Sequence, residues 1–146
     1  MEKSLSFLEE IREEFLLEGR ELGTYSPLTL AFVGDCVFDL IIRTVIVERA
    51  NQTPNKLHQK KSNVAKAPTQ AALAEVLWEQ LTEEEQSVYR RGRNAKSGTG
   101  AKNASIADYR KATGLEALIG FWYLTGQSHR MLFMIKEGLV KLNISL

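Results

Sequence analysis

The chain has 146 residues and a mass of 16.4 kDa, which is enough for one domain with a substantial core. Charged residues make up 25% and hydrophobic residues 44%, a composition that excludes an intrinsically disordered chain. The net charge of +1 excludes a uniformly basic or acidic protein, although residues 1–21 carry a net charge of −4. The single cysteine, Cys36, excludes an internal disulfide and a cysteine zinc cage, and it fits a reducing compartment.

The first 21 residues predict an acidic amphipathic helix. Its apolar stripe at helical spacing consists of Leu5, Leu8, Ile11, Phe15 and Leu16, with the acids on the opposite face. We expect this helix to end near Gly19 or Gly23. Acidic residues stand where an export signal would need an apolar run, so we expect a cytoplasmic protein.

Ser26 followed by Pro27 predicts the start of a long helix, with serine as the N-cap and proline at the first helical position. The helix is expected to run to about Arg49. Residues 28–47 are the stretch most similar to a membrane span, but three charged residues lie near its middle and would be costly in lipid. We therefore expect this helix to be buried in protein, with Cys36 as a small core residue.

The rest of the chain also has helical periodicity, so the predicted class is all-α with six or seven helices. A capping box, Thr82-Glu83-Glu84-Glu85, predicts the start of one of them. The expected elements are helices over residues 56–64, 69–79, 82 to about 91, 106 to about 125 and 128 to about 142, with a glycine-containing loop over residues 92–105.

Asp35, Asp39 and Arg43 recur every four residues in the long helix and therefore share one face. Their neighbours are apolar, and a carboxylate in such surroundings must be paired, protonated or bound to a cation. We expect Asp39 to pair with Arg43, whereas Asp35 has no base one turn away. The adjacent Gly34 costs about 1 kcal/mol against alanine in a helix, which indicates a close approach by backbone or ligand. A structural role for Asp35 is the alternative.

Glu116 lies in the most apolar stretch of the C-terminal half, and no base lies three or four residues away from it. Two carboxylates without local partners, on two buried helices, suggest an all-oxygen site for Mg²⁺ or Mn²⁺. Spacing alone leaves open whether Asp35 and Glu116 meet.

Two basic runs, residues 49–74 and 86–107, contain five bases each and no acid. The second includes a glycine-rich loop whose amides, hydroxyls and bases suit phosphate contacts. Two solvated faces are the alternative reading. The candidate contacts are Lys56, Lys60, Lys61, Lys66, Arg90, Arg91, Arg93, Lys96 and Lys102.

Three motifs resemble the ribonuclease III family. Residues 30–38 (LAFVGDCVF) resemble its signature helix, and residues 113–120 (TGLEALIG) resemble its second acidic motif. Residues 89–97 (YRRGRNAKS), with Tyr109-Arg110, look like the pattern of the Mini-III branch. The resemblance covers about residues 25–142 and implies an all-α endonuclease domain over residues 25–146. The acidic helix in residues 1–24 would precede it, without the double-stranded-RNA-binding domain of full-length ribonuclease III.

The resemblance further implies a Mg²⁺-dependent endoribonuclease that cleaves double-stranded RNA as a homodimer and leaves 5′-phosphate ends. Asp35 and Glu116 would be its catalytic metal ligands, and the Mini-III branch acts on 23S ribosomal RNA precursor. Phe32 matches the aromatic residue that packs across the dimer, with an ordinary core position as the alternative. Ala31 and Thr113 stand at two positions where ribonuclease III proper has acids, so the number of metals stays open.

Two other functions compete with this one. A non-catalytic, ribosome-associated RNA-binding module of the same fold is favoured by the two missing carboxylates and disfavoured by the presence of Asp35 and Glu116. A helical adaptor acting through the acidic N-terminal helix leaves both carboxylates unexplained. A divalent-metal cleavage assay on structured RNA separates an enzyme from the binding module.

Overall fold

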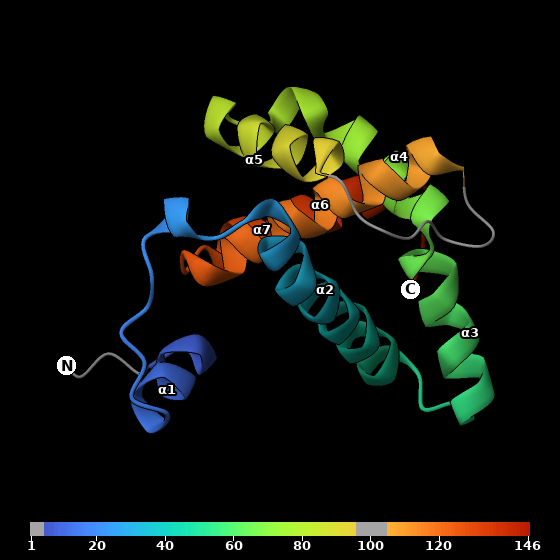
Figure 1. Ribbon diagram of the computed structural model, residues 1–146. Coiled ribbons are helices and arrows are strands. Elements are labelled where there is room, and N and C mark those ends of the chain that lie inside the picture. Colours follow the sequence, from blue (N-terminus) through green and yellow to red (C-terminus); the bar gives the residue numbers. More distant parts are fainter. Residues whose placement is uncertain (1–4, 96–104) are drawn as a thin grey trace.

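A computed structural model describes residues 5–95 and 105–146, and within these residues the chain forms helices and no strand (Figure 1). The predicted all-α class is therefore correct. The helices are α1 (Phe7–Glu14), α2 (Pro27–Arg49), α3 (Pro54–Ala65), α4 (Ala67–Leu77), α5 (Glu83–Asn94), α6 (Ile106–Leu124) and α7 (Ser128–Lys141), with single 3-10 turns at Leu22–Thr24 and Trp78–Gln80. In the part of the chain described, no helix is long and apolar enough to cross a membrane.

Helix α6 is the centre of the fold, and α2, α4, α5 and α7 all pack against it (Figure 1). Its residues are buried on nearly every side, as expected for a helix that is apolar all round. Helix α2 contributes Phe38, Ile42 and Ile46 to the same core, each at most 2% exposed. The two helices with the predicted carboxylates therefore pack directly against each other.

The predicted helix caps are confirmed. The Ser26 hydroxyl accepts a hydrogen bond from the Thr29 amide at the start of α2. At the start of α5, Thr82 and Glu85 form the reciprocal capping box.

Glu85 is also buried and accepts hydrogen bonds from the Trp122 indole and the Arg130 guanidinium, which join α5 to α6 and α7. Burial by itself raises the pKa of Glu85, but the bonds from Arg130, the Thr82 amide and Trp122 outweigh it and lower the pKa to about 2.

The N-terminal helix is shorter than predicted, because α1 ends at Glu14 rather than near Gly19 or Gly23. Leu16 adopts a left-handed backbone conformation with φ 55°, which interrupts the helix before either glycine. No residue of α1 is buried, so little packing is present to extend a helix of this length. The Arg12 guanidinium links α1 to the end of α6 through the Leu124 carbonyl at 3.2 Å.

Gly92 lies inside α5, so the loop predicted from residue 92 begins later, after Asn94. A Cβ atom at Gly92 would lie 2.7 Å from the Cβ of Ala117 and 3.0 Å from the Cα of Gly114. This glycine therefore allows α5 to approach α6 closely and does not form a turn.

Candidate active site

Two glycines bring α2 and α6 into backbone contact. A Cβ at Gly34 would lie 1.8 Å from the carbonyl oxygen of Glu116, and one at Gly120 would lie 2.0 Å from the carbonyl oxygen of Leu30. Any side chain at either position would force the helices apart, because a backbone carbonyl cannot move out of the way as a flexible side chain can. The close approach expected at Gly34 is thus an approach by backbone, and it fixes the distance between the two helices at the site.

This crossing places Asp35 beside Glu116, which answers the question that the spacing in the sequence left open. Burial raises the pKa of Glu116, and the negative charge of Asp35 together with a hydrogen bond between the two side chains raises it further, to about 8. At neutral pH the Glu116 carboxyl therefore stays protonated, and its O–H donates a hydrogen bond to Asp35. Such a pair holds one more proton than two isolated carboxylates, and a cation can replace that proton.

The two carboxylates differ in burial, and here the sequence prediction was wrong for Asp35. Glu116 is partly buried, but Asp35 is exposed. The apolar residues around Asp35 in the sequence lie on other faces of α2, since Phe38 points into the core and Phe32 is 83% exposed. The site therefore opens to solvent on its α2 side.

One face of α2 carries apolar residues without cover. Phe32, Cys36 and Leu40 follow one another at four-residue intervals, and all three are exposed. The predicted core position for Cys36, the core alternative for Phe32 and the full burial of the helix are therefore wrong. The reason is that α6 covers a different side of α2.

Ala31 and Thr113, the two positions at which ribonuclease III proper has acids, supply no charged ligand here. Ala31 is 8% exposed and Thr113 is 9% exposed, so both lie at the buried edge of the site. The Thr113 hydroxyl donates a hydrogen bond to the Tyr109 carbonyl at 3.0 Å. Among residues 5–95 and 105–146, no three His, Cys, Asp or Glu side chains gather closely enough to hold a metal ion. The donor set consists of two carboxylates, which suits a hard cation such as Mg²⁺ that completes its shell with water or phosphate oxygens.

Asp39 is engaged elsewhere. Its carboxylate accepts a hydrogen bond from the Arg43 Nε at 2.6 Å, as predicted, and its other oxygen lies 3.5 Å from the Lys61 Nζ. With two cations beside it, Asp39 is not a free ligand for a metal at Asp35.

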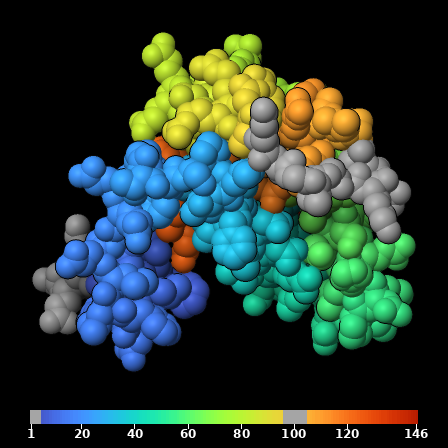
Figure 2. Space-filling model, viewed as in Figure 1, coloured from blue at the N-terminus to red at the C-terminus, as the bar shows by residue number. Residues whose placement is uncertain are grey.

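The two helices that carry most of the described basic candidates both contact the helix that carries Asp35. Helices α3 and α5 pack against α2, and the space-filling view shows α2 (cyan) at the surface between α5 (yellow) and α3 (green) (Figure 2). Their exposed candidate residues are Lys56, Lys60, Lys66, Arg90 and Arg91, whereas Lys61 and Arg93 are half-buried. The Arg93 guanidinium lies over the Tyr89 ring, and Arg90 lies over Trp78. The candidates Lys96 and Lys102 lie outside the described residues.

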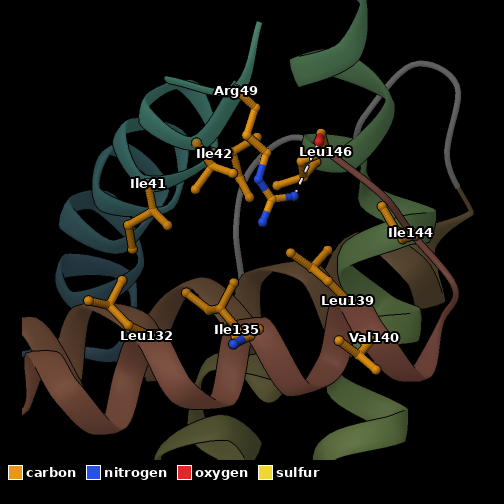
Figure 3. Close-up of a pocket in the computed structure, with 11 residues that line it drawn as sticks. Ile41, Ile42, Arg49, Leu132, Ile135, Leu139, Val140, Ile144 and Leu146 are labelled. Atoms are coloured by element: carbon orange, nitrogen blue, oxygen red, sulfur yellow. Dashed lines mark hydrogen bonds between the residues drawn. The ribbon is translucent and has the colours of Figure 1, made fainter. Parts of the chain in front are cut away.

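A separate apolar cavity of about 280 Å³ lies between α2, α7 and the C-terminal residues (Figure 3). Ile41, Ile135 and Leu139 line it, and the Arg49 guanidinium at its edge donates to the Leu146 carbonyl. None of the described residues that line this cavity has a carboxylate side chain, so they offer no donor set for the chemistry expected at Asp35 and Glu116.

Comparison with known proteins identifies the family. The ribonuclease III domain matches residues 28–127, a range that includes both carboxylates and both contact glycines. The chain belongs to the ribonuclease III family. Its members are endoribonucleases, and the helical fold agrees with that assignment.

Several similar proteins are Mini-ribonuclease 3 enzymes. That of Clostridium tetani is 44% identical over 135 residues, which cover 92% of this chain and 85% of the relative. The enzyme of Thermoanaerobacter sp. is 44% identical over 131 residues, which cover 90% of this chain and 91% of the relative. The crystal structure of a Fusobacterium nucleatum protein superposes with a TM-score of 0.75 at 27% identity, over 83% of this chain and 96% of that one.

Proposed function

We propose that this ribonuclease III family member is a Mg²⁺-dependent endoribonuclease that cleaves double-stranded RNA, with Mn²⁺ as an alternative metal. The observation that carries the proposal is the pairing of Asp35 with Glu116 across the α2–α6 crossing. Among the described residues no base forms an ion pair with either carboxylate, and such a pair of carboxylates forms a site that a divalent cation stabilises. The substrate we propose is 23S ribosomal RNA precursor in the cytoplasm, because the similar proteins are Mini-ribonucleases 3.

In this mechanism Asp35 and Glu116 would hold the metal from two different helices. When bound, a divalent cation would lower the pKa of a water and stabilise charge on the scissile phosphate. Attack of water on the phosphorus with cleavage of the P–O3′ bond would leave 5′-phosphate and 3′-hydroxyl ends. The exposed Asp35 faces the side from which RNA approaches, and the partly buried Glu116 anchors the site to the core helix. Loss of the proton from Glu116 accompanies metal binding, because cation and proton compete for the same oxygens.

The proposed function is tested by digesting 23S ribosomal RNA precursor with the purified protein, with and without Mg²⁺, and mapping the ends. We expect cuts within a helical region, dependent on the metal and bearing 5′-phosphates. Binding of the precursor without any metal-dependent cut would favour the non-catalytic RNA-binding module instead.

We propose that the basic residues of α3 and α5 bind the phosphates of the RNA. Arg93→Ala is expected to weaken double-stranded RNA binding and to reduce the slope of log K against log salt by about 1, because one phosphate contact is lost. Filter binding at several salt concentrations, with circular dichroism to verify the fold, measures both effects. Lys141→Ala, at the end of α7, is the control with an unchanged slope. Equal slopes for Arg93→Ala and the wild type would show that Arg93 belongs to a solvated face.

The assembly we propose is a homodimer in which the apolar stripe Phe32, Cys36 and Leu40 lies at or near the twofold axis. Phe32→Glu is expected to give a monomer at micromolar concentration, because a charge would replace an apolar contact. Phe32→Leu should remain dimeric. Light scattering measures the mass of each variant. A wild-type monomer with full activity at micromolar concentration would contradict the dimer.

The domain division we propose is an acidic segment over residues 1–24 followed by the catalytic domain over residues 25–146. It is supported by the family match, which begins at residue 28, and by the absence of buried residues in α1.

A further inference from the structure

Lys61 differs from the other lysines of the basic helix α3. Its side chain is only 17% exposed, whereas Lys56 and Lys60 are exposed. With Ile46 and Leu57 it lines a small cavity between α2 and α3. The stem of this lysine therefore lies among apolar residues, and its ammonium group lies near a partner within the protein.

That partner is Asp39. Its Oδ1 lies 3.5 Å from the Lys61 Nζ, while its Oδ2 accepts the 2.6 Å bond from Arg43. The carboxylate is thus shared between a base on its own helix and a base on α3. The charge of Lys61 is therefore partly compensated, and its side chain, 17% exposed, leaves little room for a phosphate.

Asp39 lies one helical turn beyond Asp35, about 6 Å along the axis of α2. Lys60 adjoins Lys61 on α3. The ion pair therefore ties the helix that carries exposed lysines to the helix that carries the candidate metal ligand, close to that ligand.

We propose that Asp39 and Lys61 are positioning residues. Their ion pair docks α3 on α2 and sets where an RNA strand held by the lysines of α3 presents its phosphate to Asp35 and Glu116. This inference rests on the proposed function, and it replaces the sequence-based expectation that Lys61 itself binds RNA.

The test compares Lys61→Met with Lys60→Met, two adjacent lysines of which one is covered and one is exposed. We measure the salt dependence of double-stranded RNA binding without divalent cation, then kcat and KM with Mg²⁺, and hydrogen exchange of the α3 amides without RNA. Lys60→Met is expected to lower the salt slope by about 1 and to leave α3 exchange unchanged.

Lys61→Met is expected to leave the salt slope unchanged, to speed exchange of the α3 amides and to lower kcat by roughly ten- to a hundredfold through misplacement of the RNA. Asp39→Asn should do the same. Lys61→Arg keeps a cation beside Asp39 and should keep kcat within a few-fold of wild type, a difference from Lys61→Met that follows from the ion pair.

A drop of about 1 in the salt slope of Lys61→Met would overturn the proposal, because it would make Lys61 a phosphate contact. Unchanged kcat or unchanged α3 exchange in Lys61→Met would also overturn it. Failure of the wild-type protein to cleave double-stranded RNA would instead refute the proposed function, and the exchange measurement would then decide the docking role by itself.

Discussion

Asp35→Asn is expected to abolish metal-dependent RNA cleavage while leaving RNA affinity within a few-fold and stability unchanged or slightly raised. The substitution keeps the shape of the side chain but removes the charge that would hold the cation and that disfavours the ionised form of Glu116. A residue that only supported the fold would show the reverse, with a loss of about 1–3 kcal/mol in unfolding free energy and activity falling only as the fold did.

Thermal unfolding and Mg²⁺-dependent cleavage are measured on the same preparation. Glu116→Gln should behave like Asp35→Asn. Asp39→Asn, the same change one turn further along α2, should lose stability because it removes the contacts with Arg43 and Lys61. Cleavage by Asp35→Asn at a near wild-type rate would show that Asp35 is not a catalytic residue.

Gly34→Ala is expected to destabilise the protein by about 3 kcal/mol or more, because the new Cβ would overlap the backbone carbonyl of Glu116. In a chain of this length that loss lowers the melting temperature by roughly 10 °C. Where the variant folds, α2 and α6 stand further apart, so cleavage should fall as well. Both are measured by calorimetry and by activity well below the transition.

Gly120→Ala should repeat the result from the other helix, since its Cβ would meet the carbonyl of Leu30. Gly23→Ala is the matched control, because a Cβ there meets nothing within 4 Å. A melting temperature for Gly34→Ala equal to that of Gly23→Ala would contradict the backbone contact on which the site geometry depends.

Most of the helices could be predicted from local sequence signals. The caps at Ser26 and Thr82 and the periodicity after them placed the long helix and α5 correctly, because a cap and the turn that follows are made by neighbouring residues. The ends of α1 and α5 were missed for a different reason. Leu16 in a left-handed conformation and Gly92 against α6 are decided by tertiary surroundings, which no local pattern contains.

The two residues of the candidate site could be predicted from the sequence, because each carboxylate lacks a basic residue one helical turn away. A carboxylate with no base one turn away pointed to both Asp35 and Glu116, and the cost of Gly34 pointed to the contact that joins them. The degree of burial was not predictable, because it depends on which side of α2 meets α6. Glu85 was expected only as part of a cap. Its bonds to Trp122 and Arg130 join residues 37 and 45 positions away, and no sequence signal marked them.

The central claim, that Asp35 and Glu116 form one metal site, is tested most directly by titrating the Glu116 carboxyl by NMR with and without Mg²⁺. Without metal the folded pKa of about 8 lies above the ordinary 4.5, so between these values the native state holds a proton that the unfolded state has lost. The metal-free protein should therefore lose stability as the pH rises from about 4.5 to about 8. We expect a Glu116 transition near 8 that Mg²⁺ moves to lower pH. A transition near 4.5 that Mg²⁺ does not move would contradict the claim.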